Sequence, residues 1–502
     1  ANGNNTSDQP SALLNERDQA IDELASIMGI TVKESTTQNG AVTINLTSGE
    51  SLVLENGAFN LFELNTNADL TFKQLKLETN FGSQTKADAS IRIVEDDLGG
   101  TLGGLFGYRN EILGPAMRDV GQLSVAFADA MNTQNKLGMD LDGQLGSNIF
   151  DIPSFRGLAY SDTNGDYVVT AQITEGKGAE LTDADYKIEV TAVTAGVPSQ
   201  IEITLLNADG TPKKDASGND IIYSNYAVTA GFNELPGGIE VDFSGTDPYT
   251  VGNEFLIQPT KDIASKITLE TNRPEDLAFA SPVRAGANNT NLGRANVIDV
   301  TVSNTEVGAS AFDGAGGLLN SAPAQINFTA ADTYDVVDGS GNVLATVTGT
   351  TDLTNLISQA GISPDPGFDL SLDGVPKAGD SFSISYNTDG FNDNSNALNL
   401  AAIQNENTVQ VSSEATNTPR TFQDAYASMV GRIGEDASMA KVTLASAEAM
   451  KVQSQNWFES VSGVSLDEEA ANLIKYQQSY AAAARILSTA QELFNTILQS
   501  AR

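Results

Sequence analysis

The chain has 502 residues, which is enough for three or four domains, and its 65 acidic and 27 basic residues give a net charge of −38 at pH 7. A surface with this excess of negative charge repels phosphate backbones and anionic lipids. We therefore expect neither nucleic acid nor a membrane surface as a partner. The sequence has no cysteine and no histidine, which excludes disulfides, thiolate nucleophiles, Cys/His zinc sites and the commonest acid–base catalyst. It also has no run of 18 apolar residues, and its polar beginning leads us to expect no signal peptide.

The polar run that begins at Ala1, ANGNNTSDQ, has no initiating methionine, so we expect a fragment or a processed product of a longer protein. Residues 1–152 are expected to form the first part of a helical and hairpin core domain. Apolar residues at helical spacing predict a helix over 10–28. Alternating apolar residues around Asn-Gly and Ser-Gly pairs predict short hairpin strands over 30–55, and ASIRIVED predicts another strand at 89–96.

A long helix is expected over 101–135, with a kink at Pro115. The segment that follows, with Asp140, Asp142 and Gly143, resembles part of a calcium loop. The further oxygen ligands and closing glutamate of such a loop are missing, so we interpret the segment as a turn. The long helix carries a broad apolar stripe: Leu102, Leu105, Tyr108, Ile112, Met117, Val120, Leu123, Phe127, Ala130 and Met131.

After this domain the hydrophobic pattern changes to a period of two, and Gly, Asp, Asn, Thr and Val dominate. We expect two inserted antiparallel β modules with polar outer faces, at 153–285 and 286–388. An internal repeat supports the pair, because 237–259 and 366–387 share a strand, a turn, and then G-[ND]-x-F at the start of a second strand.

No residue pattern indicates catalysis, and we predict no enzyme, no metal site and no cofactor. Among 65 carboxylates, chance pairs say nothing about a glycosidase. A G-x-S-x-G elbow and a Walker-type loop are both absent from the sequence. The alternative from another class is a surface adhesin or glycan-binding protein with a helical stalk, although Trp457 is the one tryptophan and the other aromatics are scattered.

The end of the chain is interpreted as helical. Residues 389–463 are expected to be the second part of the helical core domain, and their long helix over 419–461 to pack antiparallel on the helix at 101–135. Gly463 marks a joint before the C-terminal assembly helix, 464–502, which starts with the S-x-x-E capping box of Ser465. The expected fold is α+β and multidomain: a long-helix bundle domain formed by both chain ends, two inserted β modules and a coiled-coil-type C-terminal helix.

The C-terminal helix carries a heptad seam of the kind that forms coiled coils. A lone helix would leave this seam in water, so the seam requires a covering surface. One interpretation is a terminal helix docked on its own core, and the other is an interface covered by other molecules. The residues of this seam, the candidate assembly interface, are Leu466, Leu473, Tyr476, Tyr480, Ala483, Leu487, Ala490, Phe494 and Ile497, continued by Ala501.

Several motifs resemble those of the bacterial flagellar axial proteins, the rod, hook and hook-associated family. S-G-V-x-L-D-E-E at 462–469, followed by N-L, Q-Q-x-Y and F-x-x-I-L, resembles the C-terminal signature of that family. G-G-L-x-x-Y-R at 103–109, L-x-x-A-F-x-x-x-x-N-x-Q at 123–134 and G-x-x-D-N-x-N-A-L-x-L-A at 390–401 are also similar to family motifs. The likeness is greatest to the hook-associated members at the first hook–filament junction, and it argues against flagellin and the second junction protein.

The resemblance implies a structural subunit of the extracellular flagellum that joins hook to filament by self-assembly and serves motility. It implies as partners other copies of the chain, the hook protein, the second junction protein and an export chaperone. It also implies export through the flagellar type III channel without a cleaved signal peptide. Family members begin with an N-terminal helical segment that pairs with the C-terminal helix, and we expect the chain that begins at Ala1 to lack this segment. We therefore expect 464–502 to be mobile in the isolated chain and the seam to find a substitute partner.

Overall fold

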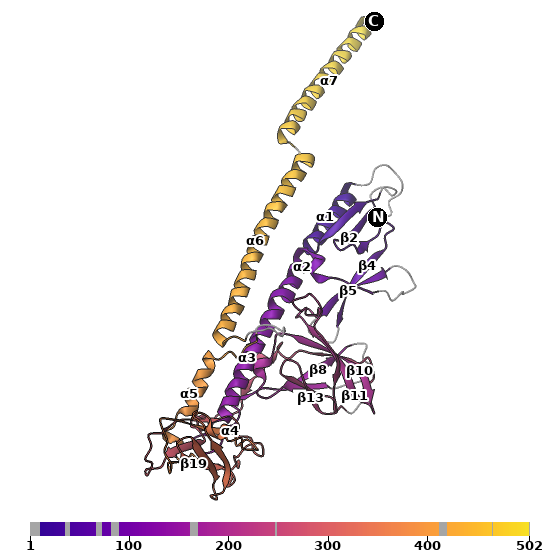
Figure 1. Ribbon diagram of the computed structural model, residues 1–502. Coiled ribbons are helices and arrows are strands. Elements are labelled where there is room, and N and C mark those ends of the chain that lie inside the picture. Colours follow the sequence, from indigo (N-terminus) through magenta and orange to yellow (C-terminus); the bar gives the residue numbers. More distant parts are fainter. Residues whose placement is uncertain are drawn as a thin grey trace. The chain divides into compact units, whose positions relative to one another are not determined.

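The structure is a computed structural model, and it has mixed α/β character with several antiparallel sheets and a C-terminal helix (Figure 1). It divides into two compact units, 1–430 and 431–502. These features confirm the predicted fold class in outline, while the packing of the long helices into a bundle and the five-part domain division remain predictions. The structure describes residues 11–35, 41–66, 73–81, 90–160, 169–245, 248–410, 419–463 and 465–500.

One helix and a six-stranded antiparallel sheet begin the first unit (Figure 1). Helix α1, Ser11–Ile27, confirms the first predicted helix. The side chains of Leu46, Leu77 and Leu98 are almost completely buried in the core of this part. The strands lie in chain order across the sheet: β1 Ile30–Glu34, β2 Val42–Leu46, β3 Ser51–Val53, β4 Phe59–Thr66, β5 Lys73–Phe81 and β6 Ser90–Arg92.

The predicted Ser48-Gly49 turn is confirmed, because Gly49 has a φ of +111° and donates its amide hydrogen to the carbonyl of Leu46. A residue with a side chain rarely adopts that φ, which explains the glycine. The Asn39-Gly40 pair lies outside the described residues. Strands β4 and β5 were not predicted, although Leu75 and Leu77 already alternate with polar residues in the sequence.

The predicted long helix is present as three consecutive segments: α2 Gly100–Gly107, the π-helical turn η2 Tyr108–Leu113, and α3 Gly114–Lys136. A π turn directly precedes Pro115, in which the amide of Gly114 donates to the carbonyl of Arg109, five residues back; the kink expected at Pro115 stays a prediction. Proline has no amide hydrogen and its ring crowds the carbonyl four residues before it, so the hydrogen-bond spacing changes where Pro115 enters the helix.

The segment after α3 is the predicted turn. The carboxylate of Asp140 accepts hydrogen bonds from the amides of Asp142, at 2.9 Å, and Gln144, at 2.8 Å. Short strands β7, Phe150–Asp151, and β16, Thr268–Leu269, then pair with each other. Single 3₁₀ turns are η1 Glu95–Leu98, η3 Gly178–Glu180, η4 Ile263–Ser265, η5 Pro274–Asp276, η6 Gly390–Asn392 and η7 Ile403–Asn405.

An eight-stranded antiparallel sheet follows, in the order β12-β11-β10-β15-β8-β9-β14-β13. Its core contains Ile188, Ile203 and Phe255, whose side chains are fully buried. Alternation of such residues with polar ones gives the sheet one buried face. The strands are β8 Phe155–Ala159, β9 Val169–Ile173, β10 Asp185–Thr194, β11 Val197–Leu206, β12 Ile222–Ala227, β13 Phe232–Leu235, β14 Ile239–Asp242 and β15 Glu254–Ile257.

A second β region has its own core, in which Phe312, Phe328 and Phe382 are fully buried. It combines a five-stranded sheet, in the order β17-β23-β19-β20-β21, with the pair β18-β22. Its elements are β17 Val283–Ala287, β18 Asn296–Val302, β19 Pro323–Ala330, β20 Thr333–Asp338, β21 Val343–Thr348, helix α4 Leu356–Gln359, β22 Phe368–Asp373 and β23 Ser381–Tyr386.

The repeated G-[ND]-x-F motif forms the same turn in both regions. The side chain of Asn253 accepts a hydrogen bond from the amide of Thr250, and that of Asp380 accepts one from the amide of Lys377, each at 2.8 Å. The phenylalanine two residues later is fully buried in each case. The repeat does not extend to strand order, because β14 and β15 share one sheet whereas β22 and β23 lie in different sheets.

Three helices complete the chain: α5 Ser395–Ala402, α6 Phe422–Ser462 and α7 Leu466–Ser500. The second long helix therefore lies within three residues of its predicted bounds, and the predicted joint at Gly463 separates α6 from α7. Both long helices begin at a capping side chain. The amide of Asp424 donates to the hydroxyl of Thr421 at 3.2 Å, and that of Glu468 donates to the hydroxyl of Ser465 at 3.4 Å.

We expect Asp380→Ala to lower the free energy of unfolding by about 1–3 kcal/mol, because it leaves three backbone amides without their shared acceptor. The Asp380 carboxylate is buried and accepts hydrogen bonds from the amides of Leu292, at 2.7 Å, of Gly293 and of Lys377. Urea unfolding measures the loss, and the exposed Asp389→Ala serves as the matched control. Equal stability of the two variants would contradict this role.

The difference in unfolding free energy between the natural chain and Asp380→Ala should depend on pH. Burial alone would raise the pKa of Asp380, but the three amide hydrogen bonds lower it below its ordinary value. A lowered folded-state pKa stabilises the fold above the unfolded pKa of about 3.9, and this stabilisation is lost as the pH falls through the folded-state value. The advantage of the natural chain over Asp380→Ala should therefore narrow below about pH 4.

Candidate assembly surfaces

Helix α3 is attached to the eight-stranded sheet through polar side chains. The guanidinium of Arg118 donates two hydrogen bonds to the carboxylate of Asp185 on β10, at 3.0 and 2.5 Å. The amide of Gln258 donates to the same carboxylate at 2.8 Å. Both charged side chains are at least 97% buried, so the pair is stable only because each charge has its partner and its hydrogen bonds.

Two further positions on the same face of α3 continue the attachment. The side-chain amide of Gln122 donates a hydrogen bond to the backbone carbonyl of Leu181 at 2.6 Å. The carboxylate of Asp129 accepts hydrogen bonds from the amides of Gly176, at 2.9 Å, and Gly178, at 2.7 Å. Burial raises the pKa of Asp129, and these two amide bonds oppose the rise. We name Arg118, Gln122 and Asp129 the polar spine of α3.

The polar spine leaves much of the predicted apolar stripe exposed. Four of its residues keep large exposed fractions: Leu105 61%, Tyr108 53%, Val120 41% and Phe127 43%. Periodicity identified this stripe but did not reveal that the polar face beside it is the buried one. The signal for the spine was present as polar residues four and seven apart within an apolar helix.

A second group of polar side chains joins the end of α3 to two later segments of the chain, one around Ala278 and one at 393–396. The amide of Gln134 donates to the side-chain oxygen of Asn396 at 2.6 Å, and Asn396 donates to the carbonyl of Ala278 at 2.6 Å. Asn387 and the amide of Ser281 donate to the carboxylate of Asp393 nearby. Two motifs that carry the resemblance, N-x-Q and D-N-x-N, therefore meet at one polar junction.

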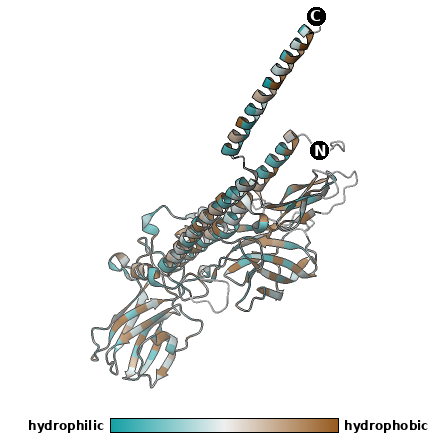
Figure 2. Cartoon of the chain, turned by 90° about the horizontal axis from the view of Figure 1, so that it is seen from above, coloured by the Kyte–Doolittle hydropathy of each residue, from teal (hydrophilic) through white to brown (hydrophobic). Residues whose placement is uncertain are grey.

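The nine candidate interface residues all lie on α7, and each is exposed. The exposed fractions of the large ones run from 60% for Leu473 to 84% for Leu466. Figure 2 shows hydrophobic residues recurring along this helix. The seam lies along one helix as its spacing requires, its assembly role remains a prediction, and Ala501 lies outside the described residues.

The apolar surface of α7 is wider than the predicted seam. Ile486 and Leu493 precede seam residues by one position, Ile474 and Leu498 follow them by one, and all four are exposed. Sequence reasoning missed these residues because it counted only the two seam positions of each heptad. A band wider than two positions suits contacts with more than one neighbour. Helix α6 adds further exposed apolar side chains: Tyr426, Val430, Ile433, Met439, Val442, Leu444, Met450, Val452, Trp457 and Phe458.

In the part of the chain that the structure describes, no three acidic side chains are grouped so that they could hold a metal ion. Within the same described ranges, no helix has both the length and the apolar character needed to cross a membrane.

Comparisons with known proteins agree with the motifs. Residues 1–150 match the family model of the flagellar hook-associated protein FlgK helical domain, and residues 457–500 match that of the flagellar basal body rod FlgEFG protein C-terminal region. Flagellar hook-associated protein 1 of Salmonella typhimurium is 27% identical over 493 residues, which cover 97% of this chain and 64% of the relative. The Escherichia coli K12 protein of the same name is 24% identical over 492 residues, with the same coverage.

The chain thus spans slightly less than two thirds of the length of these curated relatives. Among solved structures, the flagellar hook junction protein FlgK from Burkholderia pseudomallei is similar, with a TM-score of 0.69 and 26% identity. That match covers 90% of this chain and 79% of the other.

Replacing Asp185 by alanine should lower the free energy of unfolding by about 3–5 kcal/mol, because it leaves the Arg118 charge buried without its partner. The double variant Arg118→Leu/Asp185→Leu should lose much less, since no buried charge remains. Urea unfolding of the single variant, the double variant and the natural chain measures the difference. An equal loss in both variants would show that the pair contributes packing volume and not charge.

Proposed function

Because this chain belongs to the family of FlgK-type flagellar hook-associated proteins, we propose that it is a structural subunit that joins the hook to the filament of the bacterial flagellum. The exposed apolar band of α7 carries this proposal. It lies in the segment that matches the C-terminal family model of basal body rod proteins. Self-assembly through such a band needs no catalytic group, and the family is structural rather than enzymatic.

The apolar band on α7 would be covered by helices of neighbouring subunits. Contacts with these helices would bury the large apolar side chains of the band, and each Å² of apolar surface buried stabilises the contact by about 25 cal/mol. Its small residues Ala483 and Ala490 let a partner backbone approach closely. Most of the stability of α7 then comes from association, because an isolated helix of this kind is marginal in water.

The proposed neighbours are other copies of this chain, the hook protein and the second junction protein. An export chaperone would cover the same apolar band before assembly, since exposed apolar surface of this extent invites aggregation. The proposed location is the extracellular hook–filament junction, reached through the type III channel without cleavage of a signal peptide.

The polar spine and the polar junction support a mechanical role for the first unit. Buried hydrogen bonds require one geometry, because any other arrangement leaves polar groups unpaired in a low dielectric. A sheet held to α3 in this way would transmit force as a rigid body. Its attachment through polar groups also keeps the apolar stripe of α2 and α3 available to a helix of the bundle.

Motility tests the role of the seam directly. We expect Leu473→Glu/Leu487→Glu to abolish swimming and assembly, because a carboxylate buried in an apolar contact costs several kcal/mol. The control Gln478→Glu/Gln499→Glu adds the same charge on the opposite face of α7 and should leave both intact. Swimming plates and electron microscopy of hook ends measure the outcome. Normal swimming of the seam variant would contradict the proposal.

Amide hydrogen exchange tests the coupling of α7 to assembly. In the monomeric chain the amides of 465–500 should exchange within seconds to minutes, like those of a helix without tertiary cover. In the assembled form the same amides should be strongly protected, while those of β10 and β15 are protected in both forms. Strong protection of α7 in a verified monomer would mean that its seam is already covered.

A further inference from the structure

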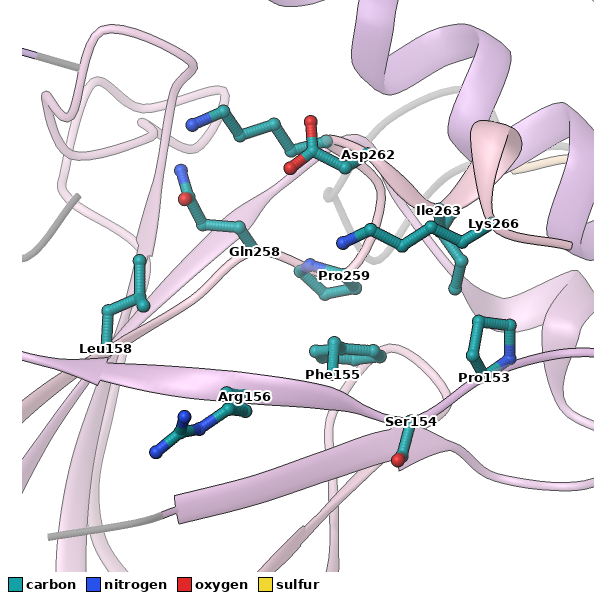
Figure 3. A pocket seen from close by; sticks show the side chains of 11 residues that line it. Pro153, Ser154, Phe155, Arg156, Leu158, Gln258, Pro259, Asp262, Ile263 and Lys266 are labelled. Atoms are coloured by element: carbon teal, nitrogen blue, oxygen red, sulfur yellow. The ribbon is translucent and has the colours of Figure 1, made fainter. Parts of the chain in front are cut away.

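A hollow of about 310 Å³ lies where β8 and the segment after β15 come together. Its floor is apolar and includes Pro153, Phe155 and Ile263. Figure 3 shows the side chain of Lys266 extending toward the middle of the hollow, with Phe155 and Pro259 below it in this view. None of the sequence motifs included these residues.

The rim of this hollow is basic in a chain that is otherwise acidic. Arg156, Lys261 and Lys266 line it together with a single carboxylate, that of Asp262, so its local charge is positive. The whole chain has 27 basic and 65 acidic residues, so three cations beside one carboxylate reverse the average ratio.

Two cations of the rim, Arg156 and Lys266, are available to a partner. Elsewhere many cations are held within the chain, as Lys213 is by Asp183 at 2.8 Å. Arg156 and Lys266 are exposed, and neither makes an ion pair with any residue that the structure describes. Their charges are therefore not neutralised internally.

We propose that this hollow, the basic-rimmed pocket, is an interaction site for an acidic segment of a second copy of the chain. A carboxylate side chain would lie against the ammonium group of Lys266, and an adjacent apolar side chain would cover the floor at Phe155 and Ile263. The proposal rests on the proposed self-assembly. The chain itself offers acidic segments in abundance, whereas its net charge of −38 repels nucleic acid and anionic lipid.

Such a contact would fix the register of neighbouring subunits. Copies with so large a negative charge repel each other in most orientations, and the few that bring carboxylates onto uncompensated cations are favoured. The apolar band of α7 has little such selectivity, because burial of apolar surface is not directional. The pocket thus supplies the orientation that apolar contacts alone leave open.

Zero-length cross-linking identifies the occupant. Equal amounts of ¹⁴N- and ¹⁵N-labelled full-length chain are assembled and treated with a carbodiimide, which joins lysine amines only to carboxylates in contact. We expect mixed-isotope cross-links from Lys266 to aspartate or glutamate of another copy. Their absence, with cross-links found elsewhere between copies, would overturn the proposal.

Charge reversal tests the energetic contribution. Arg156→Glu/Lys266→Glu should weaken self-association by about tenfold or more, as expected for the loss of close charge pairs. The control Lys33→Glu/Arg284→Glu changes the net charge equally at two other exposed cations. Sedimentation measures association, and circular dichroism checks the fold. The neutral pair Arg156→Gln/Lys266→Gln should show a smaller loss in the same direction, and it replaces the reversed pair if that pair does not fold.

The outcomes separate this inference from the proposed function. Equal weakening by both charge-reversed pairs would mean that only net charge matters, and it would overturn the site. Loss of association in the seam variant but not in the pocket variants would overturn the pocket and leave the junction role intact. Failure of the natural chain to associate at all would contradict both.

Discussion

The requirement that buried polar groups be hydrogen-bonded fixes the attachment of α3, and the rest of the first unit depends on it. Arg118, Gln122 and Asp129 each find partners on the first β region, at distances of 2.5 to 3.0 Å. Apolar side chains could slide against a sheet at small cost, but these polar groups cannot, because a displaced donor or acceptor would be left unpaired. The contact is therefore specific in rotation and in register along the helix axis.

This choice of face has a consequence for assembly. A helix that used its apolar stripe to hold the sheet would have none left for other helices. Because the polar spine performs the attachment, Val120 and Phe127 remain exposed beside it. The second unit also leaves apolar surface exposed, since α7 carries an apolar band wider than a two-position seam. The hydrogen bonds that fix α3 on the sheet are polar, and part of the apolar stripe beside them stays exposed.

Charge adds the selectivity that apolar bands do not have. The chain is strongly acidic, which keeps separate copies apart and soluble until specific contacts form. Against that background the basic-rimmed pocket is a local exception, and its apolar floor limits which acidic segments fit. In the proposed assembly, apolar contacts between helices hold neighbouring subunits together, and charged contacts of the β regions set their orientation. The polar junction of Gln134 and Asn396 links the two, because it ties the end of α3 to the return of the chain from the second β region.

The sequence by itself determined the features that depend on neighbours along the chain. These include the heptad seam of α7, its cap at Ser465, the extent of the long helix that ends at α3 and the twin turns at Asn253 and Asp380. Periodicity, capping and turn chemistry are local, so a pattern of a few residues is enough to specify them. The family motifs could also be recognised from the sequence, because each consists of residues that are close together along the chain.

Only the tertiary structure decided which face of α3 is buried, how the strands are ordered, and where distant polar groups meet. Gln134 and Asn396 are 262 residues apart, and no local pattern states that one will be the partner of the other. The same holds for the pocket, whose cations come from β8 and from the segment after β15. An apolar stripe shows that a helix has a partner, but which surface covers it is settled by long-range contacts whose hydrogen bonds must all be satisfied at once.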